Sequence, residues 1–109
     1  KTSTYPETLE ALEILVEEFY RKEKSALFYA NKLNITTKHL NRITKSSLNK
    51  TTSELISERV ILETKRLLIH SKDTFSLVSE TLGYEDYAYF SRVFKLKTKN
   101  TTQEFKKQF

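Results

Sequence analysis

Residues 40–45 read LNRITK, and residues 90–95, fifty positions later, read FSRVFK. At the same offset TTSEL, residues 51–55, returns as TTQEF, residues 101–105. Across the two pairs one Arg, one Lys, two Thr and one Glu are identical, and apolar residues replace apolar residues. Similarity at a fixed offset indicates a repeated structural unit. The sequence therefore predicts one helical unit present twice, each copy carrying an Arg and a Lys three residues apart on one helix.

The composition favours a helical protein and gives little support to an enzyme. With 109 residues the chain is long enough for one domain with a modest core. One Gly and one Pro argue against a β protein, which needs turn residues at short intervals. There are no cysteines, and no Ser-His-Asp pattern or glycine-rich phosphate loop stands out. We therefore expect no catalytic residues and no cofactor.

The sequence also gives little support to a metal-binding protein or a membrane-spanning protein. The only histidines, His39 and His70, are far apart in the sequence, so we expect no metal site. No apolar run approaches the roughly 18 residues of a membrane span, and no secretion-type segment opens the chain. We expect a cytoplasmic protein whose segment here makes no membrane contact.

The positive charge is unevenly distributed. Residues 1–24 carry four Lys and Arg against six Glu, a net charge of −2. Residues 25–109 carry fifteen Lys and Arg against eight Asp and Glu, a net charge of +7. A basic excess confined to the repeated region is typical of nucleic-acid binding, although a solubilising surface would also carry it.

Helix-start signals open the chain. Residues 4–7, TYPE, combine an N-cap Thr, a Pro in the first turn and a Glu at the third position. They predict a first helix over about residues 6–22. Its apolar face consists of Leu9, Leu12, Val16 and Phe19.

A helix, a tight turn and a second helix follow, over about residues 25–47. Ser25 is expected to cap the first of these helices, and Asn34 to end it, because Asn tolerates the left-handed conformation. Thr36 is expected to cap the next helix, over about residues 37–47. Its predicted core residues are Leu40, Ile43 and Thr44.

The second copy, over about residues 74–98, has the same signals. Thr74 is expected to cap its first helix, and Asp86 to cap a helix over residues 87–98. The only glycine, Gly83, lies where a left-handed residue is needed for the turn between them.

Capping boxes follow each copy. Residues 51–54 begin a long connector helix, predicted over about residues 52–71 and therefore roughly 30 Å long. Residues 101–104 begin a short terminal helix that ends in Phe105 and Phe109. The expected fold is all-α, with about seven helices and two helix-turn-helix subdomains joined by the connector.

These segments resemble a known family. LxRIxK in residues 40–45, TTSELI in residues 51–56 and ERVILETKRLL in residues 58–68 are similar to the DNA-binding domain of AraC/XylS-type transcription regulators. LGYEDYAYFSRVFK, residues 82–95, is the most diagnostic segment. The resemblance extends from about Leu9 to Phe109 and implies sequence-specific binding of double-stranded DNA by two recognition helices.

The resemblance also implies which residues contact DNA. Asn can read adenine and Arg can read guanine, each through paired hydrogen bonds. The expected base-reading residues are Lys38, Asn41, Arg42, Tyr87, Ala88, Ser91 and Arg92. The expected phosphate contacts are Thr37, His39, Lys45 and Lys95. For the two Arg residues a structural ion pair is the alternative role, and for His39 it is packing.

The chain departs from the family pattern at Thr44, Asn49, Thr64, Ser79, Lys99 and Thr102. The hydroxyls of Thr44 and Ser79 can bond the carbonyl four residues back in their helices. Lys99 replaces a glycine, and since lysine adopts the left-handed conformation less readily, we expect a different turn before the last helix.

Partners follow from the same resemblance. Double-stranded DNA is the expected partner, and RNA polymerase is a further candidate. Family members often carry an N-terminal ligand-binding or signalling region, and the chain starts at Lys1 without Met. We therefore expect the C-terminal part of a longer activator or repressor. The alternative is a basic helical module that binds an acidic protein.

Overall fold

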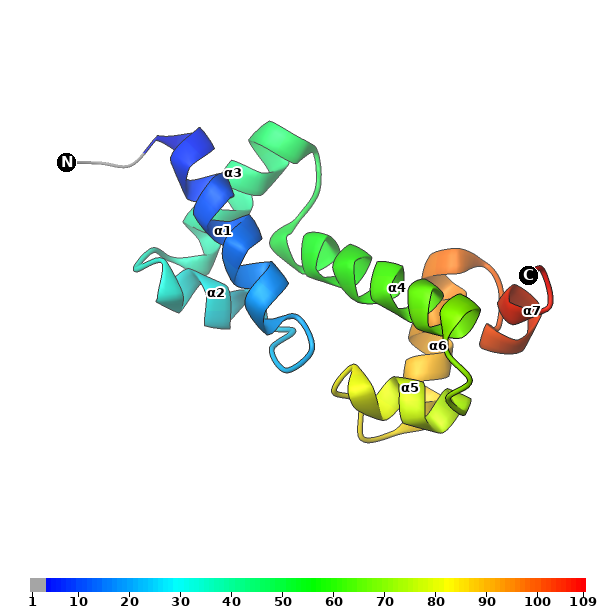
Figure 1. Ribbon diagram of the computed structural model, residues 1–109. Helices are drawn as coiled ribbons and strands as arrows, with labels where there is room; N and C mark the ends of the chain where they lie inside the picture. Colours follow the sequence, from blue (N-terminus) through cyan, green and yellow to red (C-terminus); the bar gives the residue numbers. More distant parts are fainter. Residues whose placement is uncertain (1–3) are drawn as a thin grey trace. The chain divides into compact units, whose positions relative to one another are not determined.

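The computed structural model describes residues 4–109, and all regular secondary structure within them is helical (Figure 1). This confirms the predicted all-α class. Lys1, which was counted in the charge of the N-terminal segment, lies outside the described residues. The helices are α1 (Tyr5–Phe19), α2 (Ala26–Lys32), α3 (Thr37–Leu48), α4 (Thr52–His70), α5 (Phe75–Thr81), α6 (Tyr87–Thr98) and α7 (Thr102–Lys106).

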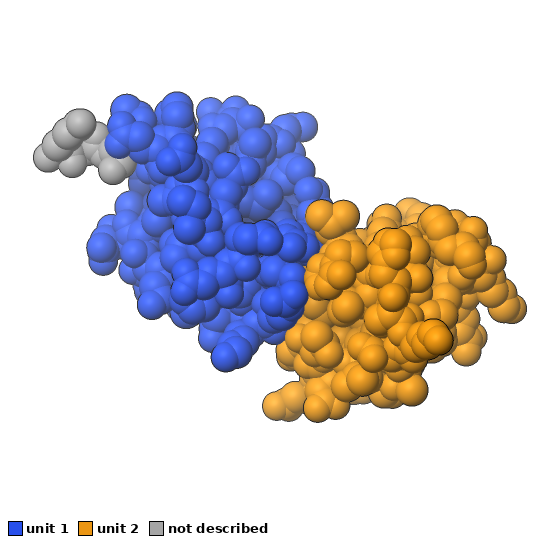
Figure 2. Space-filling model, viewed as in Figure 1, with its two compact units in different colours: residues 1–59 blue, residues 60–109 orange. Residues whose placement is uncertain are grey.

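The chain divides into two compact units, Lys1–Arg59 and Val60–Phe109 (Figure 2). The first unit contains α1, α2, α3 and the start of α4, and the second contains the rest of α4 with α5, α6 and α7. Each unit therefore holds one helix-turn-helix pair, α2 with α3 and α5 with α6.

In the first unit α1 packs on both α2 and α3. Its core consists of Leu12, Val16, Tyr20, Tyr29, Ala30, Leu40, Ile43 and Ile56. The predicted end of the first helix at residue 22 was wrong, because α1 ends at Phe19. The ammonium of Lys24 donates to the carbonyls of Tyr20 and Arg21, both at 3.0 Å. Lys24 thus satisfies acceptors that a longer helix would have bonded internally.

The second unit has an aromatic core. The Phe94 ring lies 6.4 Å from Phe90 and 5.9 Å from Phe105, measured between ring centroids. All three rings are buried, together with Val60, Ile61, Leu68, Val78 and Leu82. Phe109 does not end the last helix as predicted, because α7 stops at Lys106 and Phe109 is 71% exposed.

Side-chain oxygens cap the N-terminal ends of these helices. The predicted caps Thr4, Ser25, Thr36, Thr74, Asp86 and Thr101 each accept a hydrogen bond from a backbone N–H group in the first turn. Both predicted capping boxes are present: the Glu54 carboxylate accepts from Thr51 N–H at 2.8 Å, and Glu104 accepts from Thr101 N–H at 2.7 Å. The bond from Thr101 is the main reason why the pKa of Glu104 lies below its usual value.

Left-handed residues end helices where the sequence predicted them. Asn34 and Gly83 have φ values of 59° and 85° in the two helix-turn-helix turns. After α3 and α6, Asn49 and Lys99 have φ values of 58° and 68°. The expected difference at Lys99 was therefore wrong. Its N–H group donates to Lys95 at 2.8 Å, the same bond that Asn49 makes to Lys45.

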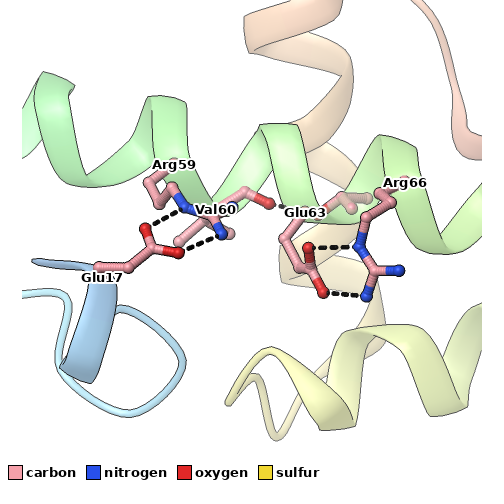
Figure 3. Close-up of polar contacts among 6 residues, drawn as sticks. Glu17, Arg59, Val60, Glu63 and Arg66 are labelled. Carbon is pink, nitrogen blue, oxygen red and sulfur yellow. Dashed lines mark hydrogen bonds and ion pairs between the residues drawn. The ribbon is translucent and has the colours of Figure 1, made fainter.

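The α4 helix carries one arginine–carboxylate pair in each unit (Figure 3). In the first unit Arg59 forms two hydrogen bonds to Glu17, at 2.7 and 2.8 Å. In the second unit Arg66 forms two to Glu63, at 2.8 and 2.6 Å, and thereby satisfies a carboxylate that is only 5% exposed. Such paired bonds fix geometry more tightly than single ion pairs do.

The buried hydroxyl groups of Thr44, Thr64 and Ser79 form hydrogen bonds within their own helices. Thr64 donates to the Val60 carbonyl four residues back, at 2.8 Å. Thr44 and Ser79 instead donate three residues back, to Asn41 at 3.2 Å and to Ser76 at 2.9 Å. Each of these buried hydroxyls therefore has a hydrogen-bond partner in its own helix.

Replacement of Gly83 by Ala tests the turn of the second unit. Ala at a φ of 85° places its Cβ atom against the backbone, so we expect Gly83→Ala to destabilise the fold by about 1–2 kcal/mol. Asn34→Gly is the matched control and should change stability little, because Gly adopts the same conformation. Urea denaturation measures both, and an unchanged midpoint for Gly83→Ala would contradict this account.

Candidate nucleic-acid interface

The α3 helix exposes one basic face. Lys38, Arg42 and Lys45 are spaced by four and then three residues, which places them on the same side of a helix. All three are exposed, whereas Leu40 and Ile43 on the opposite side are buried. The burial of the apolar side thus directs the three cations to solvent.

The α6 helix repeats this arrangement. Ala88, Arg92 and Lys95 have the same spacing and are exposed, and Phe90 and Phe94 are buried behind them. The same two positions of both helices therefore present an Arg and a Lys, while the first position differs, with Lys38 in one copy and Ala88 in the other.

The two repeated arginines form no structural ion pair within the described part of the chain. Among residues 4–109 neither Arg42 nor Arg92 has a carboxylate partner within 4.0 Å. The Arg92 guanidinium carbon lies 5.9 Å from the centre of the Tyr89 ring, a contact that leaves its N–H groups available. Both guanidinium groups can therefore bind an external acceptor.

Asn41 is only half-buried and faces the following helix. Its side-chain oxygen accepts a hydrogen bond from the backbone N–H of Thr52, the first residue of α4, at 2.9 Å. A paired contact with adenine needs this oxygen as an acceptor. Base reading by Asn41, as predicted, would therefore have to share this oxygen with Thr52 or break the bond.

Tyr87 has a comparable internal contact. Its hydroxyl lies 2.9 Å from the hydroxyl of Thr102, the first residue of α7, and the Tyr87 side chain is half-buried. The predicted contact with a base edge would leave the buried Thr102 hydroxyl without this partner. Asn41 and Tyr87 thus both bond the start of the next helix.

The other predicted site residues are intermediate in exposure. His39 is half-buried, and its ring meets the ring of Tyr5 edge to face at 6.1 Å between centroids. Packing on α1 therefore accounts for part of the His39 surface. Thr37 and Ser91 are half-buried beside the exposed basic faces.

Sequence reasoning missed Thr52 and Thr102 as partners of the two recognition helices. Each is the second residue of a predicted capping box, so each stands at a helix start whose backbone N–H groups need acceptors. That signal showed the need for a partner. It did not show that Asn41, 11 residues away, would accept from the N–H group of Thr52, or that Tyr87, 15 residues away, would bond the hydroxyl of Thr102.

Two alternatives find no support in the described residues. No group of three or more His, Cys, Asp or Glu within residues 4–109 could hold a metal ion. In the same part of the chain, every helix is too short or too polar to cross a membrane.

Comparison with known proteins identifies the family. The model of the helix-turn-helix domain family matches residues 29–108, which run from within α2 to beyond the end of α7. The chain belongs to the AraC-type helix-turn-helix family. It is accordingly a DNA-binding domain of a transcription regulator.

One relative is a longer protein. The chain is 28% identical over 90 residues to the lactose operon transcription activator of Staphylococcus xylosus. The match covers 83% of this chain and 32% of that protein. The chain therefore spans about a third of the length of this relative.

Two solved structures share the fold. The C-terminal domain of the two-component response regulator yesN from Fusobacterium nucleatum superposes with a TM-score of 0.86 at 20% identity, covering 92% of this chain and 98% of that one. The C-terminal domain of AraT, a response regulator from Geobacillus stearothermophilus, gives a TM-score of 0.88 at 17% identity, covering 94% and 85%. Both share the all-α fold of this chain.

Proposed function

We propose that α3 and α6 each enter the major groove of double-stranded DNA and read two successive segments of one duplex. In a helix-turn-helix the second helix enters the major groove. The observation that carries the proposal is the duplicated exposed face, in which Arg42 and Lys45 correspond to Arg92 and Lys95.

Within each face the roles follow from side-chain chemistry. Arg42 and Arg92 are assigned to guanine, because a guanidinium can donate to both O6 and N7. Lys45 and Lys95 lie one turn further along each helix and are assigned to phosphates. Ser91, which can pair with several bases, is a secondary reader.

The first position of each face gives the two helices different preferences. Lys38 can donate to guanine, whereas Ala88 offers only an apolar contact to a thymine methyl group. The two half-sites are therefore expected to differ in sequence rather than to form a palindrome. Thr37 and His39 are assigned to the adjacent phosphates.

The domain would act within a longer regulator. A sensor or signalling region is proposed N-terminal to it, in line with the length of the S. xylosus relative. RNA polymerase is a further proposed partner. The domain would work by binding DNA in the cytoplasm, without catalysis of its own.

Binding to duplex DNA is expected to weaken steeply as salt rises. Each neutralised phosphate contributes a slope of about −0.9 to the plot of log affinity against log salt. With Lys45 and Lys95 both on phosphates, the slope should be roughly −2 or steeper. Fluorescence anisotropy at several salt concentrations measures it. Binding to an acidic protein but not to duplex DNA would favour the interaction-module alternative.

Base reading and phosphate binding are expected to respond differently to substitution. Arg42→Ala should cost about 1–3 kcal/mol on the specific site and broaden the preference at one base pair. Lys45→Ala, the matched control on the same face, should weaken specific and non-specific binding about equally. Selection from a randomised duplex library distinguishes the two, and identical profiles would contradict the assignment.

The duplication predicts two half-sites on one face of the duplex. Insertion of five base pairs between them rotates one half-site to the opposite face, since B-DNA has about 10–10.5 base pairs per turn. We expect the footprint to shrink to one half-site. An insertion of ten pairs restores the face and separates the effect of rotation from that of distance. A footprint unchanged by the five-pair insertion would show that only one helix reads DNA.

A further inference from the structure

We propose that Asn41 is a positioning residue: it fixes α3 to the start of α4 and thereby sets the base preference of Arg42. This inference rests on the proposed function of α3. Asn41 directly precedes Arg42 in α3. The Asn41 side chain is half-buried, whereas Arg42 is exposed.

The bond that Asn41 makes answers a structural need. The first N–H groups of a helix have no partner within the helix, and a buried N–H group without an acceptor costs about 1–3 kcal/mol. Thr52 is 0% exposed, so water cannot replace the acceptor. Asn41 supplies its side-chain oxygen at 2.9 Å. The joint between α3 and α4 is thus held by a side chain of the recognition helix itself.

The contact limits what Asn41 can do at the DNA surface. Adenine recognition uses both polar atoms of the amide, the oxygen as acceptor and the nitrogen as donor. The bond from Thr52 takes one of the two lone pairs of this oxygen and fixes the orientation of the amide. A paired contact with adenine therefore competes with the start of α4.

The second copy fixes the same joint with a different residue. Tyr87, at the first position of α6, bonds the hydroxyl of Thr102. The corresponding residue of α3 is Thr37, which is too short for such a bond, and the buried hydroxyl of Thr52 has no partner among the described residues. A recurring function at this joint, filled by unrelated side chains, supports a positioning role in both copies.

A bidentate contact depends on helix position. Both hydrogen bonds of an arginine–guanine pair require donor–acceptor distances of about 2.7–3.2 Å, so a small rotation of α3 breaks at least one of them. Loss of the Asn41 bond should therefore relax the preference at the base pair that Arg42 reads. Contacts to phosphates tolerate the rotation better, and general affinity should change less.

Thr52→Pro tests the proposal without altering the DNA-facing surface. Proline is well tolerated at the first position of a helix and has no N–H group to donate. We expect selection from a randomised duplex library to show about a fivefold or larger loss of discrimination at the Arg42 pair, with the salt slope unchanged. Thr52→Val is the matched control, because it retains the N–H group and removes only an unpaired hydroxyl. It should keep the wild-type preference.

The outcomes separate the two hypotheses. If Asn41 reads a base, release of its oxygen by Thr52→Pro should leave the preference intact or sharpen it, which would overturn the proposal. Asn41→Asp provides a second test that keeps an oxygen for Thr52, in case the proline variant does not fold. It should lower affinity for all sequences and keep the same preferred bases. A shift toward cytosine, whose amino group Asp accepts, would show that residue 41 reads DNA.

Failure of the proposed function would look different. In that case the wild-type protein itself would select no sequence from the library. If the wild type selects a site and Thr52→Pro selects it with equal discrimination, only the positioning role fails. Circular dichroism of each variant confirms that the helices are retained.

Discussion

The recognition helices depend on the hydrogen bonds that begin the helices after them. An uncapped start leaves backbone N–H groups without acceptors, and loss of a cap costs about 1 kcal/mol. After α3 the chain makes one left-handed residue, Asn49, and then a capping box at Thr51. After α6 the corresponding features are the left-handed residue Lys99 and a capping box that begins at Thr101. These few residues set how the chain turns from each recognition helix into the helix that follows it.

Duplication provides a common scaffold with separate surfaces. The buried positions of α3 and α6 remain apolar, as at Leu40 and Phe90, and so the exposed side of each helix is directed outward in the same way. The exposed positions are under no packing constraint, which allows Lys38 in one copy and Ala88 in the other. Both copies therefore keep an Arg and a Lys one turn apart on the exposed face, while the side chain at the first position of that face differs between them.

Local signals predicted most of the fold, because helix starts and ends are determined by neighbouring residues. Gly83 and Asn34 marked the turns, and the caps were assigned from single side chains. The early end of α1 was missed, since it depends on Lys24, a residue outside the helix. The exposed basic faces also followed from periodicity. The partner of Asn41 could not be predicted, because its bond to Thr52 depends on how α3 packs against α4.

The two arginines differ in the aromatic contacts that surround them. Arg92 lies 5.9 Å from the Tyr89 ring, and this contact restricts a side chain that otherwise has about 2 kcal/mol of rotamer entropy to lose. At the position of Tyr89 the first copy has His39, whose ring packs on Tyr5 instead. Among the described residues Arg42 has no aromatic neighbour of this kind. In the proposed function, the orientation of Arg42 toward a base would therefore depend on the placement of α3 itself, which the bond between Asn41 and Thr52 would maintain.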